Sequence, residues 1–158
     1  MPKKTYTQIN SVTLAASTSS VSFNSIPQNF RDLIVVYRGT TASTSGVDAR
    51  VNGDSGSNYS LVRMYGGSGG LGSTAATTTY YPVIYSGNPV TGMSILQIMD
   101  YSTTDKHKDA LTRGSEYSFN IIEALASRWA NTAAITSLTI LSSGFNSGST
   151  FTLYGIEA

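Results

Sequence analysis

The sequence predicts an all-β protein: an antiparallel β-sandwich of jelly-roll type with about eleven short strands. Three observations support this prediction. Apolar and polar residues alternate with period two in many short segments, β-branched and aromatic residues are frequent in those segments, and clusters of Ser, Thr, Gly and Asn separate them. Short strands with one wet face each are buried by packing two sheets together. The length of 158 residues fits one domain, 1–158.

The expected strands follow from this alternation. In the segment 47–51, for example, valine and alanine alternate with Asp48 and Arg50, so one face of the strand is wet. The same reasoning, applied along the chain, predicts strands at 5–14, 20–25, 32–38, 47–52, 59–65, 80–85, 93–100, 107–113, 117–129, 134–141 and 149–156.

The strand around 33–37 differs from the others because it is apolar on both faces. We expect it to lie centrally, with one face in the core and the other under a loop or a neighbouring subunit. Ile34 and Val36 are therefore candidate interface residues.

Three further segments need separate interpretation. The glycine-rich stretch 66–74 is too polar for the core and too rich in glycine for a strand, so it is expected to be a flexible surface loop. Gly144 to Gly148 is expected to join the last two strands as a hairpin. The residues of 121–129 alone leave helix and strand equally open, because Ile122, Leu125 and Trp129 have helical spacing.

The composition excludes several classes of function. Only 12% of residues are charged and the net charge is +1, while 24 Ser and 20 Thr supply much of the polar surface. The six arginines are scattered, so the cluster that duplex nucleic acid requires is missing, and we expect no nucleic-acid partner. No cysteine is present, and no run of 18 apolar residues suggests a membrane span.

Catalytic and metal-binding patterns are equally sparse. His107 is the only histidine, and its cluster with two lysines and nearby acids is typical of an exposed turn. No spacing pairs two carboxylates for glycoside hydrolysis. Asp54 begins an oxygen-rich loop, but one carboxylate is too few for calcium, and a turn stabilised by its side chain is favoured. We therefore expect no enzyme activity, no cofactor and no metal.

Aromatic residues are the remaining lead. The chain has ten Tyr and one Trp, and exposed tyrosines serve both as interface contacts and as stacking platforms for sugars. Tyr80, Tyr81 and Tyr85 flank Pro82 close to the glycine-rich stretch. They are the candidate interface or glycan-binding residues, although aromatic residues are also common in sandwich cores.

Several segments of the chain resemble, as an ordered set, small β-sandwich structural proteins of tailed bacteriophages. The C-terminal quarter carries the strongest likeness, in the run from Trp129 to Ile140 and in the sequence GSTFTLYGI at 148–156. The upstream segments 25–27, 32–35 and 51–59 look like the same family and occur in the same order. In that family the tryptophan-containing segment looks like a strand, so the resemblance favours a strand at 121–129.

The resemblance implies a virion protein without catalytic residues. We expect a capsid decoration (cement) protein on the capsid surface, bound to the major capsid protein and stabilising it. The alternative is a carbohydrate- or receptor-binding module of a tail fibre or head fibre, with a host surface glycan as ligand. The low charge also predicts self-association, and a homotrimer would match a local three-fold axis of an icosahedral shell.

Overall fold

The computed structural model describes residues 5–42, 46–84, 91–117 and 120–157, and these residues form an antiparallel β-sandwich of jelly-roll type. The described residues contain no helix. The twelve strands are β1 (Tyr6–Thr13), β2 (Thr18–Phe23), β3 (Asp32–Thr40), β4 (Val47–Val51), β5 (Tyr59–Gly67), β6 (Gly70–Thr78), β7 (Tyr81–Ile84), β8 (Thr91–Ile98), β9 (Lys108–Glu116), β10 (Ile121–Trp129), β11 (Leu138–Phe145) and β12 (Thr150–Ile156).

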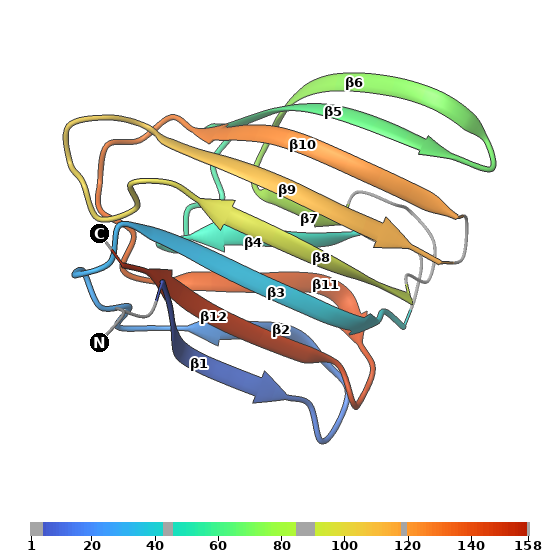
Figure 1. Ribbon diagram of the computed structural model, residues 1–158, viewed down its shortest axis with the longest axis horizontal. Coiled ribbons are helices and arrows are strands. Elements are labelled where there is room, and N and C mark those ends of the chain that lie inside the picture. Colours follow the sequence, from blue (N-terminus) through green and yellow to red (C-terminus); the bar gives the residue numbers. More distant parts are fainter. Residues whose placement is uncertain (1–4, 43–45, 85–90, 118–119, 158) are drawn as a thin grey trace.

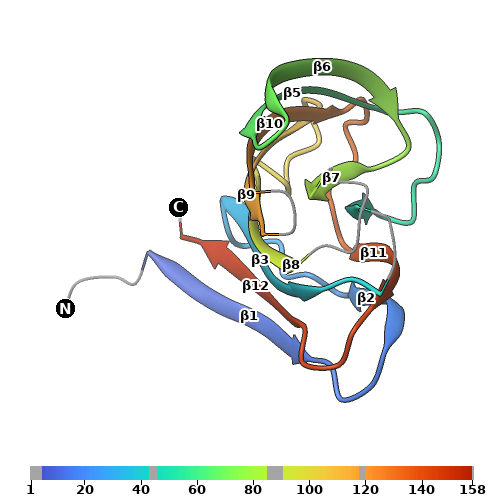
Figure 2. The ribbon, with the colours of Figure 1, turned by 90° about the vertical axis from the view of Figure 1, so that its right-hand side faces the viewer.

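The strands form two sheets of unequal size (Figure 1). The larger sheet has eight strands in the order β1-β12-β3-β8-β9-β10-β5-β6. The smaller sheet has four strands in the order β2-β11-β4-β7. Figure 2 shows the larger sheet curving around the smaller one, so that it has a concave inner side and a long outer face.

The core fills the space between the sheets. Alternate residues of each strand point inward, as Leu33, Val35 and Tyr37 do on β3, where all three are fully buried. The inward rings of Tyr37, Phe145 and Phe151 pack together at centroid distances between 4.8 and 5.8 Å. The predicted doubly apolar strand thus contributes one face to the core, as expected.

The structure corrects the prediction of a flexible loop at 66–74. These residues belong to the hairpin of β5 and β6, which pair without interruption from Tyr59 opposite Thr78 to Gly67 opposite Gly70. Glycine is used here for close approach: a Cβ on Gly72 would lie 2.5 Å from the ring of Tyr65 on the neighbouring strand. Eleven strands were predicted and twelve are present, and β6 is the strand that the sequence prediction missed.

The sequence prediction left one further segment open and was wrong about another. The segment 121–129 is a strand, β10, as the resemblance favoured. The expected hairpin at Gly144 to Gly148 is wrong, because β11 belongs to the smaller sheet and β12 to the larger. The turn at Gly148, where φ is 84°, carries the chain from one sheet to the other.

Candidate functional site

The outer face of the eight-stranded sheet carries the exposed apolar side chains of the described residues. All eight large hydrophobic residues that are exposed belong to this sheet or to the turn after β9. They are Tyr6, Val62, Met64, Leu71, Met93, Leu111, Tyr117 and Ile122. We call the outward side of this sheet the outer face. An apolar surface shared by so many strands is typical of an interaction site.

Strand register arranges these side chains in rows across the sheet. One row runs from Val62 through Ala126 and Leu111 to Gln97 and Ile34. The neighbouring row joins Met64, Ala124, Arg113, Ile95 and Val36 in the same way. Since side chains in a strand alternate between faces, the residues of both rows point away from the core.

A shallow hollow of about 320 Å³ lies where the two rows cross β10. Its lining includes the small side chains of Ala124 and Ala126, with Met64 on the neighbouring β5 and Leu111 on β9. The hollow thus arises because two alanines lie between strands that carry longer side chains. Such a shape can accept an apolar side chain from a partner.

The two outward sides of the sandwich differ in polarity. On the outer face, Arg113 is the charged residue within the two rows, and no ion pair involving it is found among the described residues. The outward side of the smaller sheet carries Asp48, Arg50 and hydroxyl residues, for example Ser22 and Thr139, whose side-chain oxygens are 2.9 Å apart. One side of the molecule is thus suited to burial against a protein and the other to contact with water.

The structure removes Tyr81 from the candidate ligand-binding residues. Tyr81 is fully buried, its hydroxyl donates a 2.7 Å hydrogen bond to the carbonyl of Lys108, and its ring meets that of Tyr59 edge to face at 5.1 Å. Burial also raises the pKa of this hydroxyl. It is a core residue because strand alternation turns it toward the larger sheet. Tyr80 is half-buried beside it, and Tyr85 lies outside the described residues.

Ile34 and Val36 do lie on the outer face, in the two rows described above. Ile34 is 8% exposed and Val36 is half-buried. The structure also adds Val62, Met64 and Leu111, which the sequence prediction did not single out. A signal was present in the sequence. Val62 and Met64 on β5 and Leu111 on β9 are apolar residues at positions that face away from the core, so these two strands carry apolar side chains on both faces.

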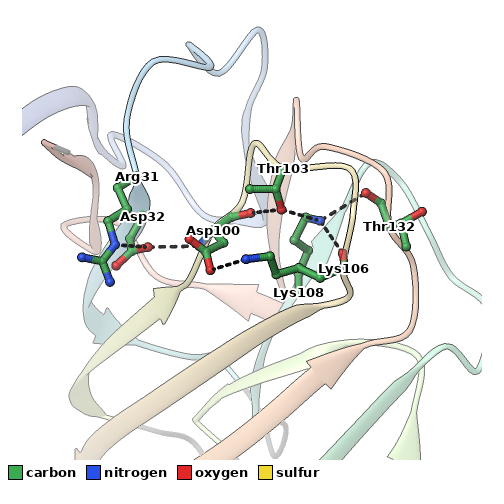
Figure 3. Close-up of polar contacts among 7 residues, drawn as sticks. All are labelled: Arg31, Asp32, Asp100, Thr103, Lys106, Lys108 and Thr132. Carbon is green, nitrogen blue, oxygen red and sulfur yellow. Dashed lines mark hydrogen bonds and ion pairs between the residues drawn. The ribbon is translucent and has the colours of Figure 1, made fainter.

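A second cluster, around Lys108, is structural (Figure 3). Lys108 is fully buried, and its Nζ donates to the carbonyl oxygens of Lys106 at 2.8 Å and Thr132 at 3.2 Å, and to Thr103 Oγ1 at 3.5 Å. Desolvation lowers the pKa of this amine. Because the three N–H donors of the ammonium group have three acceptors, the cluster ties two loops together rather than presenting a free group.

The remaining catalytic candidates stay apart. His107 is exposed, and among the described residues no hydrogen bond joins it to Asp105 or Asp109. Asp54 accepts hydrogen bonds from the Gly56 backbone at 2.8 Å and from Trp129 Nε1 at 2.6 Å, which confirms the predicted side-chain-stabilised turn. Within the described ranges, no group of three potential metal ligands occurs and no helix could cross a membrane.

Comparison with known proteins identifies no family. No protein-family model matches the chain, and no curated protein is similar to it in sequence. Among solved structures, the chain is similar to the galectin LEC-6 of Caenorhabditis elegans, with 8% identity and a TM-score of 0.40 over 90% of this chain and 95% of that one. It is similar to a congerin II double mutant at 10% identity and a TM-score of 0.35, over 87% of this chain and 99% of that one. An alginate lyase Aly36B mutant in complex with alginate tetrasaccharide gives 10% identity and a TM-score of 0.31, over 94% and 80%. This overlap is too low to transfer a ligand or an activity.

Proposed function

We propose that this chain is a non-enzymatic structural protein of a bacteriophage particle, a capsid decoration protein that binds the major capsid protein at the outside of the shell. The single observation that carries the proposal is the difference between the two sides of the sandwich. The outer face is apolar across several strands, while the opposite side carries serine and threonine. A protein lying flat on a shell has this distribution of polarity.

The ordered set of segments that resemble phage β-sandwich proteins supports the same role. Those segments lie largely in strands and turns: 32–35 in β3, and the sequence at 148–156 in the turn before β12 and in β12 itself. They form part of the scaffold that holds the outer face. The proposed function therefore requires a rigid sheet and a binding partner, and it requires no catalytic group.

Mass action provides the stabilising mechanism. A protein that binds the assembled shell but not its separated subunits stabilises the shell by the free energy of its own binding. The two apolar rows of the outer face contain one charged residue, Arg113, so apolar contacts and hydrogen bonds, rather than ion pairs, should supply most of this energy. Binding should therefore persist at high ionic strength, because salt screens charge–charge attraction and leaves apolar contacts in place.

The experiment compares particles that carry the protein with particles made without it. We expect complete particles to release their genome at a higher temperature than particles made without the protein. We also expect them to retain the protein after transfer from low salt to 1 M salt, where the Debye length is about 3 Å. Equal heat resistance of the two particle types would contradict the cement role. Loss of the protein on raising salt alone would contradict the apolar interface.

We also propose that copies associate with one another, since the low charge gives little repulsion between them. The expected homotrimer rests on the three-fold symmetry of a shell, and no contact among the described residues of this chain favours it over a two-fold dimer. The mass of the purified protein in solution tests it.

A host glycan is the second candidate ligand, and a specific groove favours it. A groove of about 700 Å³ is lined by Arg38, Thr40, Thr91, Ser115 and Tyr117, at one end of β3, β8 and β9. Hydroxyl and guanidinium donors beside an aromatic ring that is 80% exposed match the polar groups and the apolar face of a sugar. Binding to a panel of immobilised glycans, lost in Tyr117→Ala, would favour this function.

A further inference from the structure

The sandwich has four sheet edges, and three of them are protected against pairing with another chain. The pairing of β1 contains a bulge between Gln8 and Asn10, and that of β2 is irregular near Phe145. Strand β7 has four residues, includes Pro82 and pairs with a shifted register. Bulges, proline and short length are the usual devices that prevent edge-to-edge association.

The fourth edge, β6, has none of these protections. It is nine residues long, it contains neither a charged residue nor proline, and its register with β5 is continuous. It lies at the end of the larger sheet, where Figures 1 and 2 show no strand beside it on its open side. A long, uncharged and regular edge is the template that strand addition requires.

The backbone geometry identifies the groups that this edge offers. Gly67 and Gly70 flank a two-residue turn, and the two residues that flank such a turn form a hydrogen-bonded pair. Because hydrogen-bonded and non-hydrogen-bonded pairs alternate in an antiparallel ladder, the alternate residues of β6 direct their N–H and C=O groups away from β5. These residues are Leu71, Ser73, Ala75 and Thr77.

We propose that β6 pairs antiparallel with β6 of a second copy of this chain, around a two-fold axis at Thr74. In this register Leu71 faces Thr77 of the other copy and Ser73 faces its Ala75, so all four outward residues of each strand form hydrogen-bonded pairs. A register centred on any other residue leaves some of these groups without a partner. The inference is independent of the proposed function, since it concerns the free protein.

Edge protection decides in favour of a second copy over a strand from an unrelated protein. Pairing β6 with β6 uses the unprotected edge of each molecule and leaves two bulged β1 strands at the ends of a sixteen-stranded sheet, twice the eight of one chain. Growth therefore stops at two copies, as closed two-fold symmetry requires. Pairing with the β1 edge instead would leave one unprotected edge exposed on every assembly and permit open-ended growth.

Two-fold pairing would also extend the outer face. Val62 and Met64 lie one strand away from β6, opposite Ala75 and Ser73. The two outer faces would therefore meet along the axis and form one continuous surface. A dimer of this kind presents two linked binding faces to a regular array, which strengthens attachment without any new contact.

The first experiment measures the mass of the purified full chain by light scattering at tens of micromolar. We expect twice the mass of 16.7 kDa for the unmodified protein and the single mass for Ala75→Pro, which removes one outward N–H from the edge and none from the β5 pairing. Circular dichroism and thermal melting show whether the variant is folded. A monomeric or trimeric unmodified protein, or a dimeric Ala75→Pro variant, would overturn the proposal.

A second experiment does not depend on disrupting the strand. The chain has no cysteine, so Thr74→Cys introduces one thiol, which the proposed axis places directly opposite its copy at about 4.5 Å between Cα atoms, within disulfide range. Mild oxidation should convert most of this variant to a covalent dimer. The matched control is Gln8→Cys on the bulged β1 edge, which should stay largely monomeric on a denaturing gel. Equal cross-linking of the two variants would refute the assigned edge.

Discussion

At the scale of the residue, Asp48 links stability to pH. It lies between Leu141 and Pro82 on neighbouring strands, and burial raises its pKa to about 7, against a smaller opposing effect of Arg50. Its carboxyl group therefore binds a proton in the folded protein at pH values where the unfolded chain has lost it. Stability should fall as pH rises from about 4 to about 7.

Asp48→Asn should remove this dependence and make the protein more stable at pH 8 than the unmodified chain. Urea unfolding at pH 5 and pH 8 measures the effect. If the unmodified protein gained stability between these pH values, or if the variant lost it at pH 8, the assigned burial of this carboxyl group would be wrong.

Asp54 differs from Asp48 because its pKa is lowered in the folded protein, so its ionised form contributes to stability. Its carboxylate accepts the indole hydrogen bond of the buried Trp129, and this bond is the main reason why the pKa of Asp54 is lowered. Asp54→Ala leaves that indole N–H without its partner, so the free energy of unfolding should fall by about 1–3 kcal/mol. Denaturant unfolding followed by tryptophan fluorescence tests this, because Trp129 is the only tryptophan. A change below about 0.5 kcal/mol would contradict it.

At the scale of the element, most strands could be predicted because alternation is a local property of the sequence. The segment 47–51 is an example, since its inward valines and its outward Asp48 and Arg50 follow the predicted pattern. Strand β6 could not be predicted, because Gly72 is used for close contact with Tyr65 on β5 rather than for flexibility. That contact depends on a neighbouring strand, which a local pattern does not specify.

Gly92 in β8 provides a direct test of such close contact. A Cβ on Gly92 would lie 2.3 Å from the backbone carbonyl oxygen of Ser115 on β9. Backbone cannot rotate away as a side chain can, so Gly92→Ala should destabilise the protein by about 1–3 kcal/mol. Gly69→Ala is the control, because its Cβ would contact nothing within 4 Å. Equal thermal stability of the two variants would contradict the described register.

At the scale of the whole molecule, the sequence predicted two packed sheets but not which surface is exposed. Tyr81 was a reasonable candidate from its neighbours, yet the fold places it in the core. Ile34 and Val36 lie on the outer face, as the apolar pattern of their strand suggested. Their rows also contain Leu111, two strands away, and Met64, four strands away, and both come from distant segments of the chain. The rows on the outer face exist only once five strands have aligned, so no single segment reveals them.

The central claim is that the outer face binds the particle, and rebinding of purified variants to particles made without the protein tests it most directly. Leu111→Asp places a carboxylate in the middle of the outer face, where Leu111 is 49% exposed, so the fold should remain intact. Ser20→Asp makes the same change in charge on the opposite side of the sandwich, in β2. We predict that Leu111→Asp weakens rebinding at least about 10-fold, because a buried unpaired carboxylate costs more than 1.4 kcal/mol, while Ser20→Asp binds like the unmodified chain. Normal rebinding of Leu111→Asp, or loss of rebinding in Ser20→Asp alone, would contradict the account.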